Sequence, residues 1–337
     1  MTGLASPASG IHAAPRRGLR RRIVEELVAF AAIGGLKLVL HLPERPLWRI
    51  ADLAGGVSYR VSTVRRDRAR RNLRRIVEWM AANGQGAEPY RRAASDPRAL
   101  EEIVRSAFRN HARYYVEMAR APRCNTRWVS ERMVVETPAE AEALMSERRA
   151  LILVGMHFGA IEMPGFYAVS RLGEIVAPME TVANARIQRY IFSTRATIGT
   201  RIVSLEAAGH ELLGALRRNE PVGLVADRDI TGAGIEVEMF GGKTRIPAGP
   251  VLLAAETGAP IYVATVRRAG SGRYLGRVWP LATPEGATRR ERSRAMAREE
   301  ARVFEQMIID APEQWLALFH PIWPDLEQST MQDGKGA

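Results

Sequence analysis

The sequence has little that would support a disulfide, a metal site or a nucleotide cofactor. Cys124 is the one cysteine among 337 residues, which excludes an intrachain disulfide and a cysteine-based zinc site. The six histidines include no pair at the spacing of metal ligands on a helix. There is no G-x-S-x-G nucleophile elbow. Gly242-Lys243-Thr244 resembles the end of a P-loop, but Val237 replaces the required earlier glycine.

The chain also lacks an uninterrupted hydrophobic run long enough to be a clear membrane span. Residues Ile23–Leu42 are mostly apolar, but Glu25, Glu26 and Lys37 interrupt them, and a span needs about 20 apolar residues. Five arginines precede the run within Arg16–Arg22, and no small-residue cleavage site of a signal peptide follows it. Two interpretations stay open: a helix that lies in the membrane interface, and a core helix with a basic flank.

Negative charge is in deficit, and the formal net charge is +12. Eight arginines and one acidic residue occur within Arg60–Arg75. Such a field favours anionic partners. Because no nucleic-acid motif and no interleaved aromatic residues accompany the arginines, we expect an anionic membrane surface as the partner and no nucleic acid.

From Val134 onward, short apolar runs alternate with helical patterns. The predicted strands are Leu151–Val154, Ile175–Pro178, Ile202–Leu205, Val222–Ala226, Ile261–Val266, Tyr274–Trp279 and Trp315–Phe319. The predicted helices are Ala183–Ile198, Ala207–Arg218, Ala248–Thr257 and Arg289–Asp310, with an earlier one from Pro97 to about Arg120. This alternation is typical of an α/β fold with a mostly parallel central sheet flanked by helices.

Four segments follow from these patterns. We predict a disordered basic tail over residues 1–22 and a helical, membrane-associating N-terminal region over 23–125. The α/β core should cover residues 126–325, and a flexible tail should cover 326–337.

His157 stands directly after the most apolar of the predicted strands. In open α/β sheets, ligands bind outside the carboxyl ends of the strands, so we expect His157 to emerge at such a site. A neutral imidazole there can take a proton, and a nearby carboxylate can orient the ring. The alternative is a structural histidine, with Glu162 stabilising the start of a helix through its dipole.

Two more strand-end or helix positions could join His157. Asp227 follows the strand Val222–Ala226 and could point into the same crevice; its alternative role is a turn or N-cap residue. Arg195, on the helix Ala183–Ile198, could bind an anionic headgroup or a donor phosphate, or it could be a solvated surface charge.

An ordered set of motifs resembles a known family. The segment His157-Phe158-Gly159-Ala160-Ile161-Glu162 is similar to the H-x4-[D/E] signature of lysophospholipid acyltransferase-like enzymes, in the H-F-G-x-x-E form of the lipid A late (lauroyl/myristoyl) acyltransferases. The likeness spans about Val134–Asp325 and continues through Ala226–Asp229, Val237–Gly241, Pro247–Gly249, Glu256–Pro260 and Gln314–Leu316. The A-D-R-D and R-I-P-A-G-P segments are nearest to the phosphatidylinositol mannoside acyltransferase branch.

The resemblance implies a glycerolphosphate acyltransferase-like fold and a membrane-associated O-acyltransferase. Such an enzyme moves a fatty acyl chain from acyl-CoA or acyl-carrier protein to a hydroxyl of a membrane glycolipid or phospholipid. A phosphatidylinositol mannoside-like acceptor is favoured, at the cytoplasmic face of the inner (plasma) membrane. No metal and no cofactor beyond the acyl donor is expected.

The resemblance also implies the site residues. The catalytic residues would be His157, as general base, and Glu162, as its dyad partner; the substrate-binding residues would be Arg195, Asp227 and Arg228. One departure is Ala160-Ile161, where the family usually has Asn-Trp, which leaves the headgroup specificity open.

Two alternatives stay open at this point. A lipid A or lysophospholipid acyltransferase would have the same fold and a different acceptor. A non-catalytic basic peripheral membrane protein would bind anionic surfaces without consuming an acyl donor.

Overall fold

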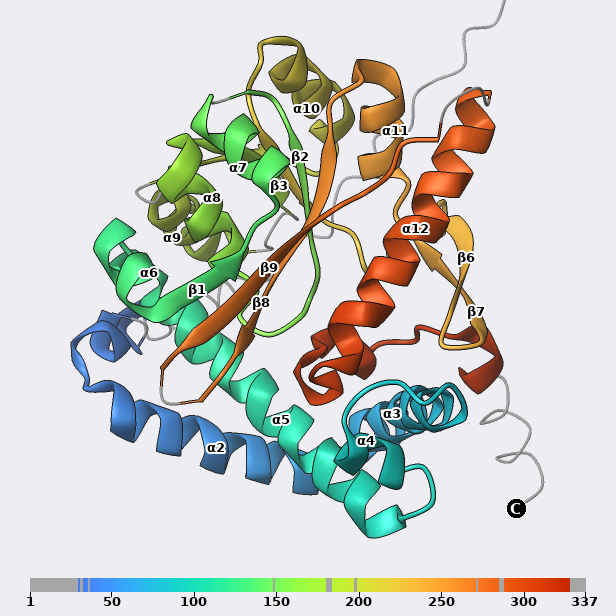
Figure 1. Ribbon diagram of the computed structural model, residues 1–337. Helices are drawn as coiled ribbons and strands as arrows, with labels where there is room; N and C mark the ends of the chain where they lie inside the picture. The colour runs from blue at the N-terminus through green and yellow to red at the C-terminus, as the bar shows by residue number, and fades with distance from the viewer. Residues whose placement is uncertain are drawn as a thin grey trace, which may run out of the picture.

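Figure 1 shows the computed structural model, which describes residues 30, 33–35, 37–147, 149–179, 184–196, 199–270, 272–284 and 288–327. The predicted tail over 1–22 lies outside these residues, as do most of Ile23–Leu42 up to residue 36 and the tail from residue 328 onward. Among the described residues, no helix combines the length and the apolar composition needed to cross a bilayer.

A seven-stranded sheet forms the centre of the molecule, in the order β1-β9-β8-β2-β5-β3-β4. The strands are β1 (Met133–Glu136), β2 (Ile152–Gly155), β3 (Ile175–Met179), β4 (Thr200–Ser204), β5 (Val222–Val225), β8 (Ile261–Arg268) and β9 (Tyr274–Pro280). Strands β8, β2, β5, β3 and β4 run parallel, whereas β9 is antiparallel to β8 and carries β1 parallel to itself. The prediction of a mostly parallel sheet is therefore confirmed.

Helices cover both faces of the sheet, and alternate side chains of the central strands meet them. On one face, α7 (Ala139–Ser146) and α8 (Met163–Leu172) pack with Leu151 and Leu153. On the other face, α10 (Ala208–Arg217), α11 (Gly249–Thr257) and α12 (Arg289–Ile309) pack with Ile152 and Val154. This alternation follows from the two-residue period of a strand. The helix α9 (Ala185–Ala196) contacts β4 at the sheet's edge.

Within the described ranges, several helices precede the sheet. They are α2 (Glu44–Val61), α3 (Thr63–Ala82), α4 (Glu88–Arg92) and α5 (Pro97–Arg120), and a short α6 (Thr126–Arg132) leads into β1. Of these, α3 and α5 contribute to the buried core of the sheet. The predicted helix from Pro97 is confirmed: Asp96 caps it by accepting hydrogen bonds from two backbone N–H groups. Leu73 of α3 and Phe108 of α5 lie in one buried cluster with Trp315. Figure 1 shows α2, α3 and α5 side by side at one end of the sheet.

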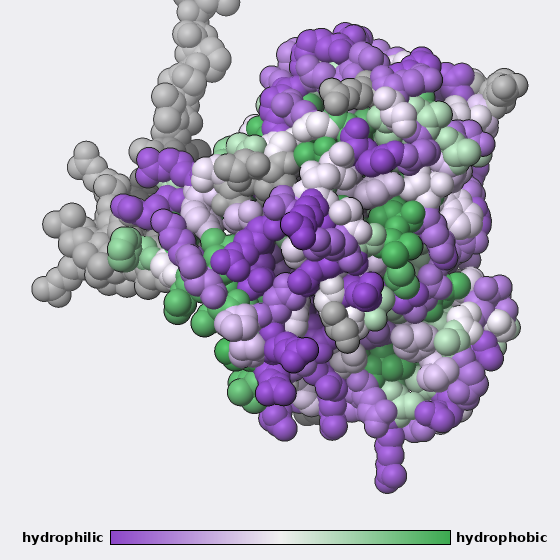
Figure 2. Space-filling model, turned by 60° about the vertical axis from the view of Figure 1, so that its left-hand side comes forward, coloured by the Kyte–Doolittle hydropathy of each residue, from purple (hydrophilic) through white to green (hydrophobic). Residues whose placement is uncertain are grey.

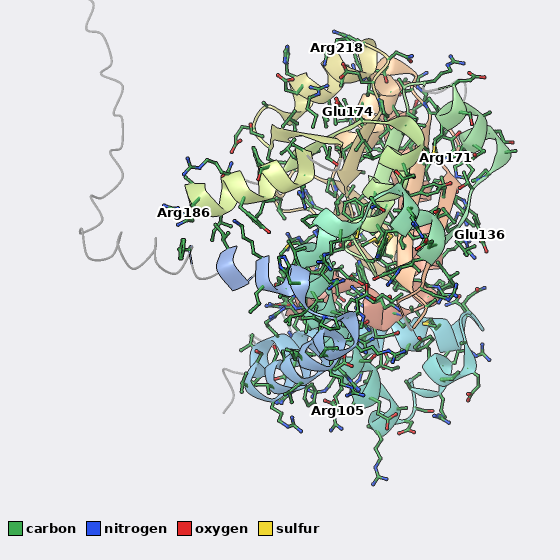
Figure 3. All side chains as sticks on the ribbon, turned by 90° about the vertical axis from the view of Figure 1, so that its left-hand side faces the viewer. Arg105, Glu136, Arg171, Glu174, Arg186 and Arg218 are labelled. Carbon is green, nitrogen blue, oxygen red and sulfur yellow. The ribbon has the colours of Figure 1, made fainter. Side chains whose placement is uncertain are left out.

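The arginine-rich helix α3 holds the C-terminal segment. Arg68 and Arg71 form ion pairs with Glu327, Arg70 pairs with Glu101 of α5, and Arg75 pairs with Asp325. These four arginines belong to the stretch that we expected to face a membrane. Much of its charge is thus compensated within the chain. Other charged side chains lie at the periphery of the molecule in Figure 3, including Arg105, Glu136, Arg171, Glu174, Arg186 and Arg218.

The predicted strand Trp315–Phe319 is wrong. The structure has two 3₁₀ turns there, η2 (Pro312–Gln314) and η3 (Leu316–Phe319), and Trp315 between them makes a single bridge to Phe158. Every residue from Trp315 to Phe319 is buried, and η3 packs against α3 and α5. An apolar run of this length does not distinguish a strand from a buried turn.

A separate hairpin, β6 (Ile235–Met239) with β7 (Gly242–Ile246), leads to α11.

Candidate active site

The register of two neighbouring strands brings His157 and Asp227 together. In the parallel pair β2–β5, Gly155 lies opposite Val225. His157 comes two residues after Gly155, and Asp227 comes two residues after Val225. The two side chains therefore occupy equivalent positions beyond adjacent strand ends, which is where open α/β sheets place their ligands. The prediction that Asp227 lies in the crevice with His157 agrees with this geometry.

Asp227 receives hydrogen bonds from three groups. Its Oδ1 lies 2.7 Å from His157 Nδ1, and its Oδ2 accepts from the backbone N–H of His157 at 3.0 Å and from Trp315 Nε1 at 2.7 Å. The Asp227 side chain is 0% exposed, whereas that of His157 is 35% exposed. Burial raises the pKa of Asp227, but the attraction of His157 and these hydrogen bonds outweigh it and hold the pKa below its usual value. The carboxylate is therefore ionised.

This arrangement selects one tautomer of the imidazole. An ionised carboxylate only accepts hydrogen bonds, so Nδ1 carries a proton and donates it to Asp227. In the neutral ring, Nε2 then carries the lone pair. The nitrogen that can take a proton is the one that points away from the buried carboxylate. The pair has the parts of a general base: a proton acceptor, and an anion that stabilises the cation formed when the proton arrives.

The loop from His157 to Glu162 is fixed by its backbone. Gly159 has φ +58°, and a Cβ on it would overlap the carbonyl of Val266, so this position accepts glycine alone. Gly159 N–H donates to Gln314 O at 2.8 Å, and Ala160 N–H donates to Val266 O at 2.8 Å. The His157 carbonyl accepts from Leu316 N–H at 2.6 Å. The loop is thus held between β8 and the segment around Trp315.

Glu162 has a different partner from the one that the sequence suggested. It stands at the N-cap position of α8, and its Oε1 lies 2.5 Å from Arg195 Nη2 of α9. The carboxylate hydrogen-bonded to His157 Nδ1 is Asp227, where we expected Glu162. The reason is that the chain turns into α8 at residue 162, which directs this side chain toward α9. The structure therefore replaces the expected His157–Glu162 pair with two pairs, His157–Asp227 and Glu162–Arg195.

An apolar cavity opens beside the Glu162–Arg195 pair. Its volume is about 790 Å³ including the part open to solvent. Strands β2, β3, β4 and β5 and helix α8 supply its walls, through residues that include Leu153, Phe166, Ile175, Ile202 and Leu224. Three of the lining residues are glycines (Gly155, Gly165 and Gly223), which leave room between the strands and α8. Glu162 and Arg195 also line it, so this mostly apolar hollow has one charged pair.

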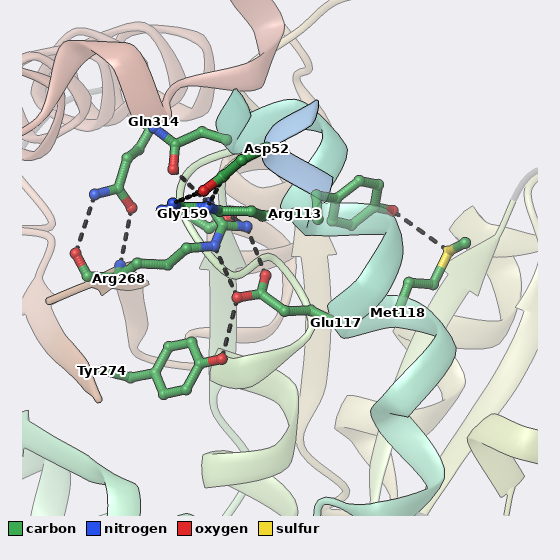
Figure 4. A network of polar contacts seen from close by, with 10 residues as sticks. Asp52, Arg113, Glu117, Met118, Gly159, Arg268, Tyr274 and Gln314 are labelled. Carbon is green, nitrogen blue, oxygen red and sulfur yellow. Dashed lines mark hydrogen bonds and ion pairs between the residues drawn. The ribbon is translucent and has the colours of Figure 1, made fainter. Parts of the chain in front are cut away.

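A buried polar network also supports the loop. Arg268 Nε and Nη2 donate to Glu117 of α5 at 2.7 and 2.5 Å, and Nη2 also donates to the Gly159 carbonyl at 2.9 Å. Tyr274 OH donates to Glu117 at 3.1 Å, and Gln314 exchanges hydrogen bonds with the Arg268 backbone. Figure 4 shows these side chains pointing toward one another. The network ties α5, β8 and β9 to the backbone between His157 and Glu162.

Two more ionisable groups lie near the site. Arg228, a predicted substrate-binding residue, is partly buried, and its buried Nε has no hydrogen-bond partner among the described residues. Glu300 of α12 is 0% exposed, and neither of its oxygens has a partner among those residues. Burial, and then the negative charge of Asp227, raise the pKa of Glu300 well above its usual value. Glu300 is therefore neutral behind an ionised Asp227.

The sequence alone did not indicate several of these residues. Trp315 lies in a run that we took for a strand, and Glu117 lies on the predicted helix from Pro97, to which we assigned no site residue. Arg268 and Glu300 had no motif around them. Within the described part of the chain, no group of three or more His, Cys, Asp or Glu side chains is arranged to hold a metal ion.

Comparisons with known proteins place this site in context. Residues 15–324 match the sequence profile of bacterial lipid A biosynthesis acyltransferases. The chain is 28% identical over 250 residues to a phosphatidylinositol mannoside acyltransferase of Mycolicibacterium smegmatis, covering 73% of this chain and 76% of that protein. It is 27% identical over 248 residues to the protein of that name from Mycobacterium tuberculosis, covering 72% and 73%.

Among solved structures, the chain is similar to the 1-acyl-sn-glycerophosphate acyltransferase PlsC of Thermotoga maritima. The TM-score is 0.34 at 15% identity, over 60% of this chain and 86% of that one.

Proposed function

Since the chain belongs to the bacterial lipid A biosynthesis acyltransferase family, we propose that it transfers a fatty acyl chain from a thioester to a hydroxyl of a membrane glycolipid. The favoured acceptor resembles a phosphatidylinositol mannoside, because the two mycobacterial relatives act on such lipids by name. One observation carries the proposal: the His157–Asp227 pair stands at the strand ends, where the loop that starts at His157 leads into the wall of an apolar cavity.

In the proposed reaction, His157 Nε2 takes the proton of the acceptor hydroxyl. The oxygen attacks the thioester carbonyl carbon, the C–S bond breaks, and the proton passes from His157 to the departing thiolate. Asp227 stays ionised throughout and stabilises the imidazolium. A positioned general base contributes about 10²–10⁴-fold to a rate. This acid–base step requires no cofactor, and the acyl donor, acyl-CoA or acyl-carrier protein, is consumed as a substrate.

Arg195 is the cation that lines the cavity, and its Glu162 partner holds it in place. We propose that Arg195 stabilises the negative charge that develops on the thioester carbonyl oxygen during attack. A hydrogen-bond donor that is held in place in a water-poor site is effective in this role. In this proposal Glu162 acts through Arg195 and is a positioning residue. The acyl chain occupies the cavity, whose apolar walls exclude water from it.

Helix α2 offers a face for the membrane that the acceptor requires. Leu47, Ala51 and Gly55 pack on α5, and a Cβ on Gly55 would overlap the α5 backbone at Phe108 and Arg109. The opposite face exposes four apolar side chains, by between 48% and 71%. These are Ile50, Leu53, Val57 and Val61, which share one stripe of the helix.

Basic residues accompany this stripe. Arg45, Arg49 and Arg60 belong to the same helix, and each arginine near an anionic bilayer contributes about 1 kcal/mol. Figure 2 shows apolar patches between charged side chains on one side of the molecule. We propose that α2 lies on the cytoplasmic face of the inner membrane with its apolar stripe among the lipids.

Flotation with vesicles tests the membrane face. A variant with Leu53→Asp and Val57→Asp should lose binding to vesicles that contain phosphatidylglycerol. The matched control, Leu205→Asp with Leu275→Asp, changes two exposed leucines outside α2 and should keep it. Equal flotation of the two double variants would contradict this assignment.

An acceptor panel tests the reaction. The purified protein is incubated with palmitoyl-CoA and, separately, with a phosphatidylinositol mannoside, a lipid A precursor and lysophosphatidic acid. Thiol release and the mass of the extracted lipid are measured. We expect the mannoside to gain one acyl group. Acylation of another lipid would replace the acceptor, and an absence of thiol release with every acceptor and with acyl-carrier-protein donors would overturn the proposal.

A further inference from the structure

A second group of side chains surrounds Phe319, at the turn that follows Trp315. The guanidinium of Arg65, from α3, stacks over the Phe319 ring at 4.8 Å from its centroid. The His111 ring, from α5, packs edge-on against Phe319 with 5.0 Å between centroids. Arg65 Nη2 lies 3.2 Å from His111 Nε2. Phe319 therefore holds an arginine and a histidine from two different helices beside each other.

A buried asparagine fixes the residue that follows. Asn72 of α3 is 1% exposed, and its Nδ2 donates to the carbonyls of Leu318 at 2.8 Å and His320 at 3.1 Å. These hydrogen bonds set the path of the backbone as it leaves η3. His320 is thus presented next to Phe319 from a rigid support, and its own side chain is only partly exposed to solvent.

The charges that act on His320 show what lies around it. Burial of the ring and then the positive charges of Arg228, His157 and Arg65 lower the pKa of His320 to about 4. Burial, Arg65 and His320 lower the pKa of His111 to about 4. A nearby carboxylate would have acted in the opposite direction. The bonded connections place the same residues together: Arg228 follows Asp227, which bonds His157 and Trp315. Phe319 and His320 follow Trp315 after one turn, and Arg65 stacks on Phe319. Arg65, Arg228 and His320 therefore surround the same turn near His157.

Apart from Asp227, which is bonded to His157 and Trp315, no carboxylate forms an ion pair with this group among the described residues. No ion pair joins Arg65 or Arg228 to an acidic side chain there, and the buried Nε of Arg228 has no acceptor. The neighbouring carboxylate of Asp229 is occupied by Thr231, Gly232 and Gly234. In contrast, Arg195 already has Glu162. An unpaired buried donor is unfavourable, and arginine binds phosphate through paired N–H groups.

We propose that Arg65, Arg228 and His320 bind a phosphate ester of a substrate beside His157, apart from the apolar cavity. This inference rests on the proposed acyl transfer, because it supplies the anion. The phosphate ester belongs to one of two sources: the phosphodiester of the acceptor lipid, or the phosphates of the donor's coenzyme A. The cluster and the cavity share none of their residues. In this proposal the phosphate ester lies at the cluster, the acyl chain lies in the cavity, and His157 lies between them.

Paired substrates with and without phosphate test the site. Arg228→Gln and Arg65→Gln remove one positive charge each, and Arg218→Gln removes an exposed arginine labelled in Figure 3 as a control. The acceptors are a phosphatidylinositol mannoside and an alkyl mannoside without phosphate. The donors are palmitoyl-CoA and palmitoyl-pantetheine, which lacks phosphate. Thermal unfolding establishes that each variant is folded.

In the variants at 65 and 228, we expect KM for one phosphate-bearing substrate to rise about 10–100-fold, as for a lost hydrogen bond to a charged group. KM for its phosphate-free counterpart should stay within about twofold, and the Arg218→Gln control should not change either. A rise confined to the mannoside pair assigns the acceptor, and one confined to the donor pair assigns coenzyme A. Equal effects on substrates with and without phosphate would overturn the proposal.

A binding measurement separates this site from the acyltransferase activity. Calorimetric titration of the wild-type protein with glycerophosphoinositol and with coenzyme A requires no turnover. Binding of one of them that weakens at least about 10-fold in Arg228→Gln supports the phosphate site even if no acceptor is acylated. Absence of binding for both ligands, or equal binding by wild type and variant, overturns the site. Transfer to the alkyl mannoside by the wild type would still support the proposed reaction.

Discussion

Asp227→Asn changes one atom of a buried carboxylate and reverses the hydrogen bonding available to His157. Oδ2 of Asp227 accepts from two N–H groups, those of the His157 backbone and of Trp315, so the amide oxygen of asparagine must take that place. The amide nitrogen then faces Nδ1, at the position now 2.7 Å away. Nδ1 has to accept, and the single ring proton moves to Nε2. The nitrogen that should take a proton no longer can.

The size of the loss follows from the role of the pair. General-base catalysis contributes about 10²–10⁴-fold, and an Asp→Asn change that imposes the wrong tautomer has a cost near the upper end, about 10⁴-fold in a known triad. We expect kcat to fall within about 10²–10⁴-fold. KM should change little, because the Asp227 side chain is 0% exposed and cannot contact a substrate. Stability should also change little, because both donors to Oδ2 keep an acceptor.

Thiol release from palmitoyl-CoA at saturating acceptor measures kcat. Asp310→Asn is the matched control, since it neutralises an exposed aspartate whose partner is Arg277; its kcat should equal that of the wild type. A folded Asp227→Asn variant with more than about one tenth of wild-type kcat would refute the assignment of Asp227 as the group that orients His157.

Three further predictions follow from buried groups and from the cavity. Glu300→Gln should raise the midpoint of thermal unfolding more at pH 8 than at pH 4. Folding raises the pKa of the Glu300 carboxyl, so above the usual pKa of about 4.3 ionisation of this group in the unfolded chain opposes folding, and glutamine removes that effect. An equal effect at both pH values would show that Glu300 is charged in the folded protein. Arg268→Met leaves Glu117 buried without its partner and should lower the unfolding free energy by about 3–5 kcal/mol in denaturant titration, whereas a loss below about 1 kcal/mol would mean that water reaches the pair. Gly223→Val places a Cβ 2.9 Å from Ile175 Cδ1 in the cavity wall, so the kcat/KM ratio of decanoyl-CoA to palmitoyl-CoA should rise, and an unchanged ratio would place the acyl chain elsewhere.

The sheet could be predicted because its strands are short apolar runs that end at glycine or at polar residues. β2 and β5 fall within one or two residues of their predicted bounds, and the setting of His157 follows from β2 alone. The family resemblance is confirmed by the match over residues 15–324. The local sequence pattern is sufficient to predict an element when the residues next to each other in the sequence determine its structure.

The partner of His157 could not be read in the same way. The pairing with Asp227 depends on the register of β2 with β5, and single-sequence patterns do not specify which strands become neighbours. The spacing of five residues between His157 and Glu162 suggested contact, but the first turn of α8 directs Glu162 to Arg195. Topology decides which side chains meet, and the sequence spacing does not encode it.

The arginines of α3 illustrate the same limit. Their density suggested an outward-facing basic helix, yet Arg68 bonds Glu327 at a separation of 259 residues. The exposed apolar stripe on α2 became visible only once α5 was seen to cover the opposite face at Gly55. Long-range ion pairs and helix crossings are set by tertiary packing, which overrides local propensity.

The claim that His157 activates the acceptor hydroxyl is tested most directly by the turnover of purified His157→Ala with a thioester donor and a mannoside acceptor. We predict a loss of kcat of at least about 10²-fold, with the thermal midpoint and the affinity for the donor unchanged. Turnover near that of the wild type in a folded variant would contradict it.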